Sequence, residues 1–164
     1  MKLYMKQKVF SLKGYFTIKD EQENDKYYVE GEFPTIGNKL HVYDMNHNEI
    51  AFIKEIVLSF MGKYEVYVNS ELVTIIKGKV SFIKEKLELE NLGWKVEGNL
   101  TSHEYVIRDI SNNEILSVSK AWFSWGDSYE IEIADSRNEV LAIAIVLAID
   151  CVLESRQAAS ASAT

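Results

Sequence analysis

The chain has 164 residues, a length that suits one domain with a sizeable hydrophobic core. Hydrophobic residues make up 47% of the sequence and aromatic residues 12%, which excludes an intrinsically disordered protein. The net charge of -7 argues against a dedicated nucleic-acid-binding protein, because such a protein needs a strongly basic surface.

The cysteine content and the first residues of the sequence bear on the cellular compartment. Cys151 is the single cysteine, so no disulfide framework is possible and a reducing environment is indicated. The opening stretch "MKLYMKQKVFSLKG" contains lysines but no apolar run of the roughly 7–15 residues that a secretory signal requires. We therefore expect a cytoplasmic protein.

Short runs in which apolar and polar residues alternate predict about twelve β-strands before residue 135. The segments between them are rich in Asn, Asp and Gly, which tolerate the positive φ angles of tight turns. The predicted strands span residues 6–11, 15–20, 27–33, 39–44, 49–56, 64–69, 72–77, 80–85, 93–99, 104–110, 114–123 and 128–134.

The two halves of this strand-rich region resemble each other. "YDMNHNEIAFIKE" (43–55) aligns with "RDISNNEILSVSK" (108–120), and "YEVYV" (64–68) aligns with "YEIEI" (129–133). The offset stays between 64 and 67 residues in every matched pair, which is too long for a solenoid repeat. We interpret it as the duplication of a six-stranded unit, over residues of about 6–69 and 72–134.

The last predicted element is a helix over residues 138–155, in which Asp150 is the only polar residue between Val140 and Leu153. These 14 apolar-rich residues fall short of the roughly 20 that cross a bilayer, so we expect no transmembrane span. A helix that is apolar on every side must be buried on every side. Twelve antiparallel strands protect their edges by closing into a barrel, which is wide enough to hold more than side chains.

The sequence therefore predicts a mainly β fold. We expect a closed antiparallel barrel of about 12 strands, built from two similar halves, with the C-terminal hydrophobic helix threaded through its centre. Residues 1–156 would form this single domain, and the small polar residues 157–164 would form a flexible tail.

Three stretches resemble the LURP-one-related family of the tubby-like superfamily, and its bacterial members in particular. They are "MKQKVFSLKGYFTIKDE" at the start, "AWFSWGDSYEIEI" in the second half and "EVLAIAIVLAIDCVLE" at the end. The resemblance covers most of residues 1–155 and implies a tubby-like barrel plugged by its helix. Superfamily relatives include tubby proteins, which bind phosphoinositide headgroups, and the membrane-anchored, calcium-dependent phospholipid scramblases.

Four lysines around a predicted hairpin form a candidate site for an anionic ligand such as a phosphate headgroup. They are Lys77, Lys79, Lys84 and Lys86, and on each strand alternate residues share one face. The alternative is a solvated strand face that protects a sheet edge, because nearby glutamates would neutralise the lysines. Those glutamates are Glu85, Glu88 and Glu90.

The stretch "WFSWGDSY" gathers aromatic residues about another hairpin. Trp122 and Trp125 are the candidate interaction surface, since exposed tryptophans suit protein or membrane contacts. The alternative is cross-strand aromatic packing within the barrel wall.

No motif in the sequence predicts catalysis, a metal or a cofactor. Asp44 and Asp109 occupy matching turns, where Asp is an ordinary turn former. A hairpin turn is favoured over an EF-hand-like calcium loop starting at Asp44, because Glu49 stands where that loop needs glycine. His41 and His103 belong to no zinc-binding pattern.

Asp150 is the one charged residue of the hydrophobic helix. Its carboxylate could pair with an inward-facing group or act as a buried acid. We expect it to be solvated at the mouth of the barrel, because an unpaired buried carboxylate is costly.

The sequence therefore predicts a non-enzymatic binding or scaffold module. Its expected ligand is an anionic phospholipid surface or a protein partner, contacted through the outer wall. The alternative is an intracellular carrier of a small apolar ligand inside the barrel. No nucleic-acid partner is expected, and the sequence leaves the oligomeric state open.

Overall fold

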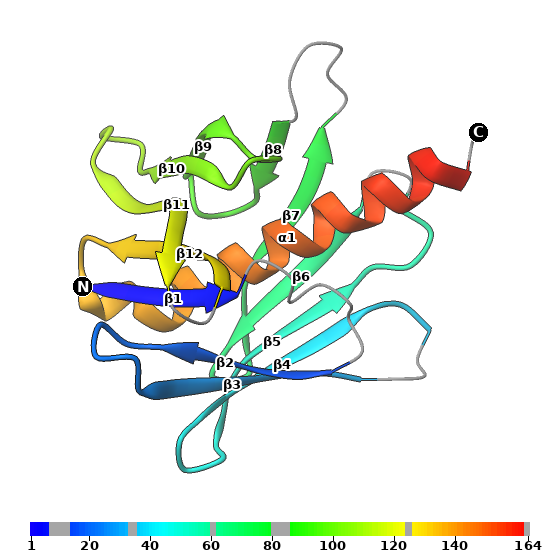
Figure 1. The fold of residues 1–164 in the computed structure, drawn as a ribbon. Helices are drawn as coiled ribbons and strands as arrows, with labels where there is room; N and C mark the ends of the chain where they lie inside the picture. The colour runs from blue at the N-terminus through cyan, green and yellow to red at the C-terminus, as the bar shows by residue number, and fades with distance from the viewer. Residues whose placement is uncertain (7–13, 33–35, 60–61, 80–85, 124–125, 163–164) are drawn as a thin grey trace.

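The computed structural model describes residues 1–6, 14–32, 36–59, 62–79, 86–123 and 126–162, with the side chains of Lys6, Trp122, Phe123 and Asp127 left aside. These residues form one 12-stranded sheet, a short 3-10 helix and one long α-helix (Figure 1). The strands are β1 (Lys2–Lys6), β2 (Tyr15–Lys19), β3 (Asp25–Gly31), β4 (Lys39–Asp44), β5 (Glu49–Glu55), β6 (Lys63–Val68), β7 (Glu71–Lys79), β8 (Lys86–Leu89), β9 (Lys95–Asn99), β10 (Glu104–Arg108), β11 (Glu114–Phe123) and β12 (Gly126–Ile133). The helices are η1 (Ser136–Asn138) and α1 (Glu139–Ser162).

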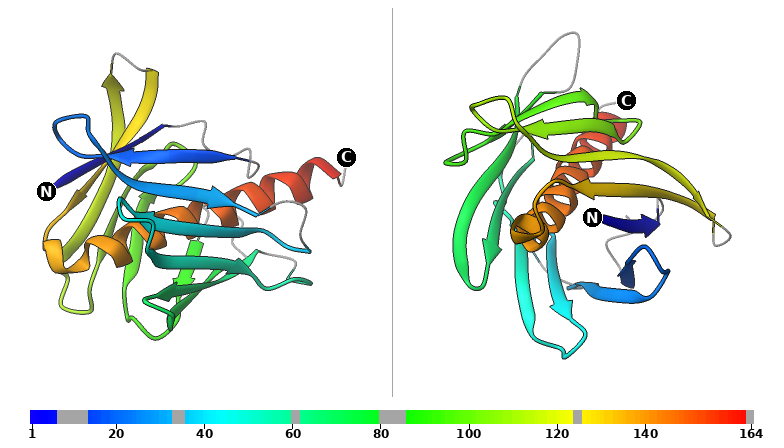
Figure 2. Two further views of the ribbon diagram at one scale, coloured as in Figure 1. Left: turned by 90° about the horizontal axis from the view of Figure 1, so that it is seen from below. Right: turned by 90° about the vertical axis from the view of Figure 1, so that its left-hand side faces the viewer.

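The sheet curls around α1 and makes a nearly closed antiparallel barrel (Figure 2). Each strand pairs with its neighbour in sequence, and β1 also pairs with β12 from Lys2↔Glu132 to Lys6↔Ser128. The sheet order begins at β8 and ends at β9, which leaves one seam without a ladder between the described parts of these two strands. The predicted plugged barrel is confirmed, with this seam as the place where the ring of ladders is interrupted.

The core lies between the helix and the inner face of the sheet. Every residue of α1 from Ala142 to Leu153 is buried. Inward-facing residues of the strands pack against them, among them Val29, Ile53 and Ile131. The helix is buried because it is apolar on all sides, as its sequence predicts.

The backbone of the wall comes close to the helix at Gly62, just before β6. A Cβ atom at Gly62 would lie 3.4 Å from the Cα and Cγ1 atoms of Val152, and φ at this glycine is +70°. Both the contact and the left-handed conformation favour glycine here.

The beginning of the helix is defined by Asp135. Its carboxylate accepts a hydrogen bond from the backbone N–H of Arg137 at 2.9 Å, which caps η1 and leads the chain into α1. The end of α1 differs from the sequence prediction, because the helix continues through residues 157–162. Three of these six residues are alanine, the strongest helix former, which explains the extension into a segment that the sequence suggested was a flexible tail.

Two strands of the structure were not predicted, and the strands predicted nearest to them fall almost entirely on residues outside the described part of the chain. The first strand is Lys2–Lys6, one stretch earlier than the predicted 6–11, and the eighth is Lys86–Leu89, just after the predicted 80–85. Residues 7–13 and 80–85 lie outside the described part of the chain. In "KLYMK", the three middle residues Leu3, Tyr4 and Met5 are apolar or aromatic and all are buried. The alternation of apolar and polar residues that predicts strands is therefore missing.

Candidate functional site

The antiparallel order gives the barrel two chemically different ends. Odd-numbered strands all run toward one end, and α1 runs in the same direction, so its C-terminal turns emerge there (Figure 1). We call this the basic end, because the strand residues that border it include five lysines and only two glutamates, Glu55 and Glu104, and the described connections add one more, Glu32, which pairs with Lys39 at 2.8 Å. The lysines, which we call the basic rim, are Lys6, Lys39, Lys63, Lys79 and Lys86.

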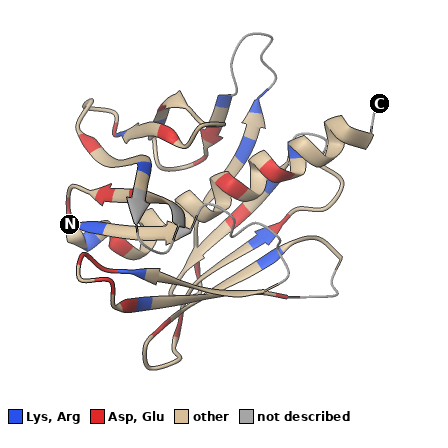
Figure 3. Ribbon diagram, viewed as in Figure 1, with Lys and Arg blue, Asp and Glu red and all other residues tan. Residues whose placement is uncertain are grey.

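The opposite end is acidic. The strand residues that border it include five carboxylates and four basic residues, and the connections there add six carboxylates and one arginine. Figure 3 shows Asp and Glu on the turns that lie away from the C-terminus of α1. The protein with net charge -7 therefore has an uneven distribution of charge along the barrel axis.

The structure places the candidate lysines of β7 and β8 at the basic end, where Lys79 pairs with Lys86 in the ladder. The Nζ atom of Lys77 lies 2.8 Å from Glu90 and 3.4 Å from Glu88, and the Nζ atom of Lys79 lies 2.9 Å from Glu88. These contacts raise the pKa of Lys77 and lower the pKa of Glu88.

Lys77 and Lys79 are therefore largely neutralised, as the solvated-face alternative expected. Lys86 is exposed, and among the described residues neither Lys86 nor Lys63 has an ion pair. Lys84 lies outside the described residues. Among the described residues, the positive charge without an ion pair at this end is thus carried by the exposed Lys86 and the half-buried Lys63, which the sequence did not single out.

The candidate aromatic hairpin also points toward the basic end. Trp122 is the second-last residue of β11 and pairs with Asp127 of β12 in the ladder. Its side chain and all of Trp125 lie outside the described part of the structure. An interaction surface at these tryptophans stays a prediction.

The same end carries exposed apolar side chains that the sequence analysis missed. Leu58 is 96% exposed, Ile36 is 87% exposed and Val57 is 45% exposed. They occupy the connections that follow β5 and β3. The signal in the sequence is apolar residues between predicted strands, at Ile36 before Gly37 and in "IVLS".

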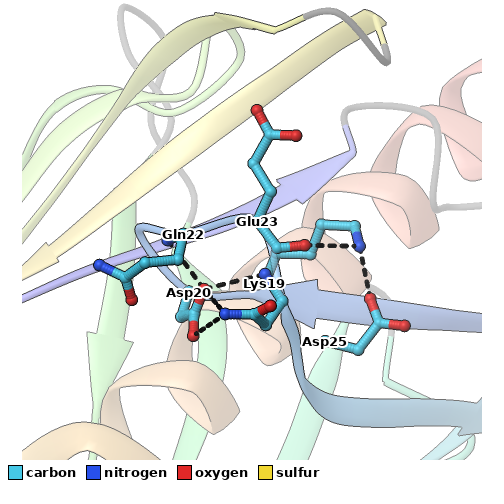
Figure 4. Close-up of polar contacts among 6 residues, drawn as sticks. Lys19, Asp20, Gln22, Glu23 and Asp25 are labelled. Carbon is cyan, nitrogen blue, oxygen red and sulfur yellow. Dashed lines mark hydrogen bonds and ion pairs between the residues drawn. The ribbon is translucent and has the colours of Figure 1, made fainter.

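The acidic end contains a turn that recurs three times with the pattern D-x-x-x-N. Asp44 accepts backbone hydrogen bonds from Asn46 at 2.8 Å and Asn48 at 2.9 Å, and its other oxygen accepts from the Asn48 side chain at 2.9 Å. Asp109 makes the equivalent three bonds. Figure 4 shows the same arrangement at Asp20.

These hydrogen bonds lower the pKa of Asp44 and Asp109. Asp44 and Asp109 are thus turn formers, as the sequence analysis predicted. In the described parts of the chain, no group of three His, Cys, Asp or Glu side chains is arranged to hold a metal ion.

Asp150 is the largest departure from the sequence analysis. It is 3% exposed, and burial raises its pKa above the ordinary carboxyl value. Its Oδ2 atom accepts a hydrogen bond from the hydroxyl of Tyr129 at 2.9 Å, and the Nε2 atom of His103 lies 3.2 Å from its Oδ1 atom. The expected solvated position at the barrel mouth is wrong, because these two partners accommodate the carboxylate inside.

The surroundings of Asp150 make a small polar cluster in an apolar core. The rings of His103 and Tyr129 stack with centroids 4.7 Å apart. Tyr105 is also buried, and the negative charge of Asp150 adds to burial in raising its pKa. His103 reaches the cluster from the turn after β9 with φ of +54°, a conformation that sequence patterns do not reveal.

His41 lies elsewhere, on the outer face. Its ring nitrogens contact Glu32 at 2.8 Å and Glu49. The two histidines therefore belong to separate environments, and His41 shares no partner with His103. Among the described helices, none is long and apolar enough to span a membrane.

A 12-stranded barrel closed around a buried C-terminal helix is a tubby-like fold. The X-ray structure of a protein from Arabidopsis thaliana has the same fold, with a TM-score of 0.63 at 14% identity over 91% of this chain and 89% of the other. The chain belongs to the LURP-one-related family, whose model matches residues 1–150. It is 35% identical over 153 residues to the uncharacterized protein YxjI of Bacillus subtilis, which covers 93% of this chain and 94% of that protein.

Proposed function

We propose that this LURP-one-related protein is a non-enzymatic binding module that docks on an anionic phospholipid surface through its basic end. The observation that supports this function is the concentration of lysines where the strands meet that end, while the carboxylates gather at the other. Lysine close to an anionic membrane contributes about 1 kcal/mol of attraction.

The distribution of charge also favours one orientation. An anionic surface attracts the basic end and repels the acidic end. The barrel would therefore bind with its basic end, and the C-terminal turns of α1, toward the surface. Screening limits this effect to roughly 8 Å at physiological salt, so the rim lysines act only when that end faces the lipid.

A nucleic acid is a weaker candidate for the same surface, because a net charge of -7 opposes binding along an extended polyanion. A protein partner with an acidic face would fit the rim and is the second outcome to be tested. A small apolar cargo is disfavoured, since the space inside the wall is filled by buried helix residues from Ala142 to Leu153.

Co-sedimentation with phospholipid vesicles tests the proposal. We expect binding to vesicles that contain phosphatidylglycerol, little binding to pure phosphatidylcholine vesicles, and weakening as salt rises. Equal binding to both kinds of vesicle, or none to either, would contradict the proposal. If the protein binds neither kind of vesicle, an acidic protein becomes the partner to test for the basic rim.

Two matched variants locate the contact. Lys86 begins β8 at the basic end and Lys95 begins β9 at the acidic end, and both are exposed. Lys86→Gln should weaken binding to anionic vesicles roughly fivefold, the equivalent of about 1 kcal/mol. Lys95→Gln makes the same change in net charge and should leave binding unchanged.

A further inference from the structure

Two neighbouring turns at the basic end present large apolar side chains to solvent. Leu58 and Ile36 are among the most exposed large hydrophobic residues of the described chain, and Val57 stands beside them. A single exposed leucine is common, but apolar residues gathered at one site often mark a contact with a membrane or a protein.

The two turns lie against each other. A Cβ atom at Gly37 would lie 2.9 Å from the Cγ2 atom of Val57. The backbone N–H of Glu55 donates to the carbonyl of Asn38 at 2.8 Å, and the backbone N–H of Asn38 donates to the Glu55 carboxylate at 2.8 Å. Ile36 and Leu58 therefore project from one joined pair of turns, which we call the apolar tips.

Leu58 has an unfavourable backbone conformation for its residue type. Its φ is +74°, in the left-handed region where Gly and Asn are favoured and leucine is rare. The side chain gains almost no burial in return, since it is nearly fully exposed. A strained and exposed leucine is better explained by a contact outside the chain than by the stability of the fold.

The apolar tips are fixed to the helix where it leaves the barrel. The Asn38 side chain donates to the hydroxyl of Tyr64 at 3.0 Å, and that hydroxyl lies 2.7 Å from the Oγ atom of Ser155 in α1. Tyr64 is fully buried. The tips are thus held on a rigid base, at the end toward which the helix points.

The rim lysines indicate what kind of partner contacts the apolar tips. Lys39 and Lys63 begin the strands that follow the two turns. Lys39 pairs with Glu32 at 2.8 Å, so among the described residues Lys63 supplies the positive charge without an ion pair beside the apolar side chains. An anionic phospholipid bilayer presents negatively charged headgroups at its surface and apolar acyl chains beneath them. A second copy of the chain fits poorly, because contact through this end would bring two lysine rims together.

We propose that Ile36, Val57 and Leu58 insert into the interfacial region of an anionic phospholipid bilayer when the basic end docks. This inference rests on the proposed function and adds the residues that enter the lipid. Lysines of the rim would contribute the dependence on anionic lipid, and the tips would contribute binding that salt does not screen.

Vesicle binding of serine variants tests the insertion. Ile36→Ser and Leu58→Ser should each weaken binding to phosphatidylglycerol-containing vesicles, roughly tenfold if the side chain is buried in lipid. Ile110→Ser is the matched control, because Ile110 is 79% exposed at the acidic end. It should bind as the wild type does.

A second measurement detects insertion directly. Leu58→Cys and Ile110→Cys can each carry a polarity-sensitive fluorophore, since Cys151 is buried and protected from labelling. We expect a blue shift on anionic vesicles for the label at position 58 and none at position 110.

The outcomes separate the two proposals. If wild-type protein binds anionic vesicles and Lys86→Gln weakens it, while the serine variants and the label at position 58 show no change, the insertion is wrong and the proposed function stands. If wild-type protein binds no vesicle, both proposals are overturned.

Discussion

The Nε2 atom of His103 lies 3.2 Å from the Oδ1 atom of Asp150, so the turn after β9 is tied to the helix inside the barrel. That turn borders the seam where the sheet lacks a ladder between β8 and β9. Leu100, at the start of the same turn, is buried in the core. The contact between His103 and Asp150 thus supplies, beside the seam, an attachment that hydrogen-bonded strands supply elsewhere.

Asp150→Asn should change the pH dependence of stability. Burial raises the pKa of Asp150 in the folded protein, so the stability linked to this carboxyl is complete below its ordinary value near 3.8 and is lost as pH rises through the folded value. The asparagine has no charge to bury and can still accept from Tyr129. We expect the free energy of unfolding of the variant, relative to wild type, to increase with pH from about pH 4 upward.

Urea unfolding at a series of pH values checks this expectation. The stability curves must be interpreted together with the other groups that face Asp150. These are His103 from the turn, Tyr105 and Tyr129 from the sheet, and Cys151 and Glu154 from the helix. Parallel stability curves for variant and wild type would show that Asp150 keeps its ordinary pKa. Asp150→Ala is the contrasting variant, which should cost about 1–3 kcal/mol because it leaves the Tyr129 hydroxyl without its acceptor.

Leu58→Asn should stabilise the folded protein slightly while it weakens lipid binding. Asparagine tolerates the left-handed conformation that Leu58 adopts at φ of +74°, and little buried contact is lost. The gain should be about 0.5–1 kcal/mol. A thermal or urea melt measures it, and a loss of stability would show that the leucine stabilises the turn.

The Asp turns at the acidic end should make the stability of the fold sensitive to acid. Hydrogen bonds lower the pKa of Asp44 and Asp109, so the stability linked to these carboxylates is present above their ordinary pKa and is lost as pH falls through the lowered values. Carbon-detected NMR titration should give values below 3.8 for both residues. The Asp44→Asn variant should lose less stability on acidification than wild type, and an equal loss would contradict this account.

The buried helix should account for much of the stability of the barrel. Ile145 is fully buried at the middle of the apolar stretch. Ile145→Ala should lower the free energy of unfolding by about 2–5 kcal/mol, from lost burial and the cavity left behind. Ala158→Ser, in the exposed part of the same helix, is the control and should change it by less than about 0.5 kcal/mol.

The helix and most strands could be predicted because each has one dominant pattern. A stretch without polar residues from Val140 to Ile149 can only be buried, and alternation marks strands such as Glu49–Glu55. Tyr4 and its neighbours in β1 lack that alternation, so β1 could not be predicted. The strand predicted over residues 6–11 lies, apart from Lys6, outside the described residues. Helix propensity in the alanine-rich tail was underestimated because the segment is small and polar.

The site was harder to predict than the fold. The lysines on β7 and β8 share a hairpin, so their spacing placed them together, but Lys63 reaches the same end only through the strand order. The environment of Asp150 depends on the left-handed conformation of His103 and on the helix depth, and neither leaves a signal in residue order. The apolar tips could be recognised only from the solvent exposure of their side chains, which the sequence does not report.

Pairing between β1 and β12 has a consequence for the order of events during synthesis. β1 leaves the ribosome long before β12, because β12 and the helix that fills the barrel follow only after residue 125. Until then, the nascent chain holds an open sheet with apolar residues and an unpaired edge toward water. We expect chains truncated before β12 to aggregate and to depend on chaperones, whatever their local strand propensity.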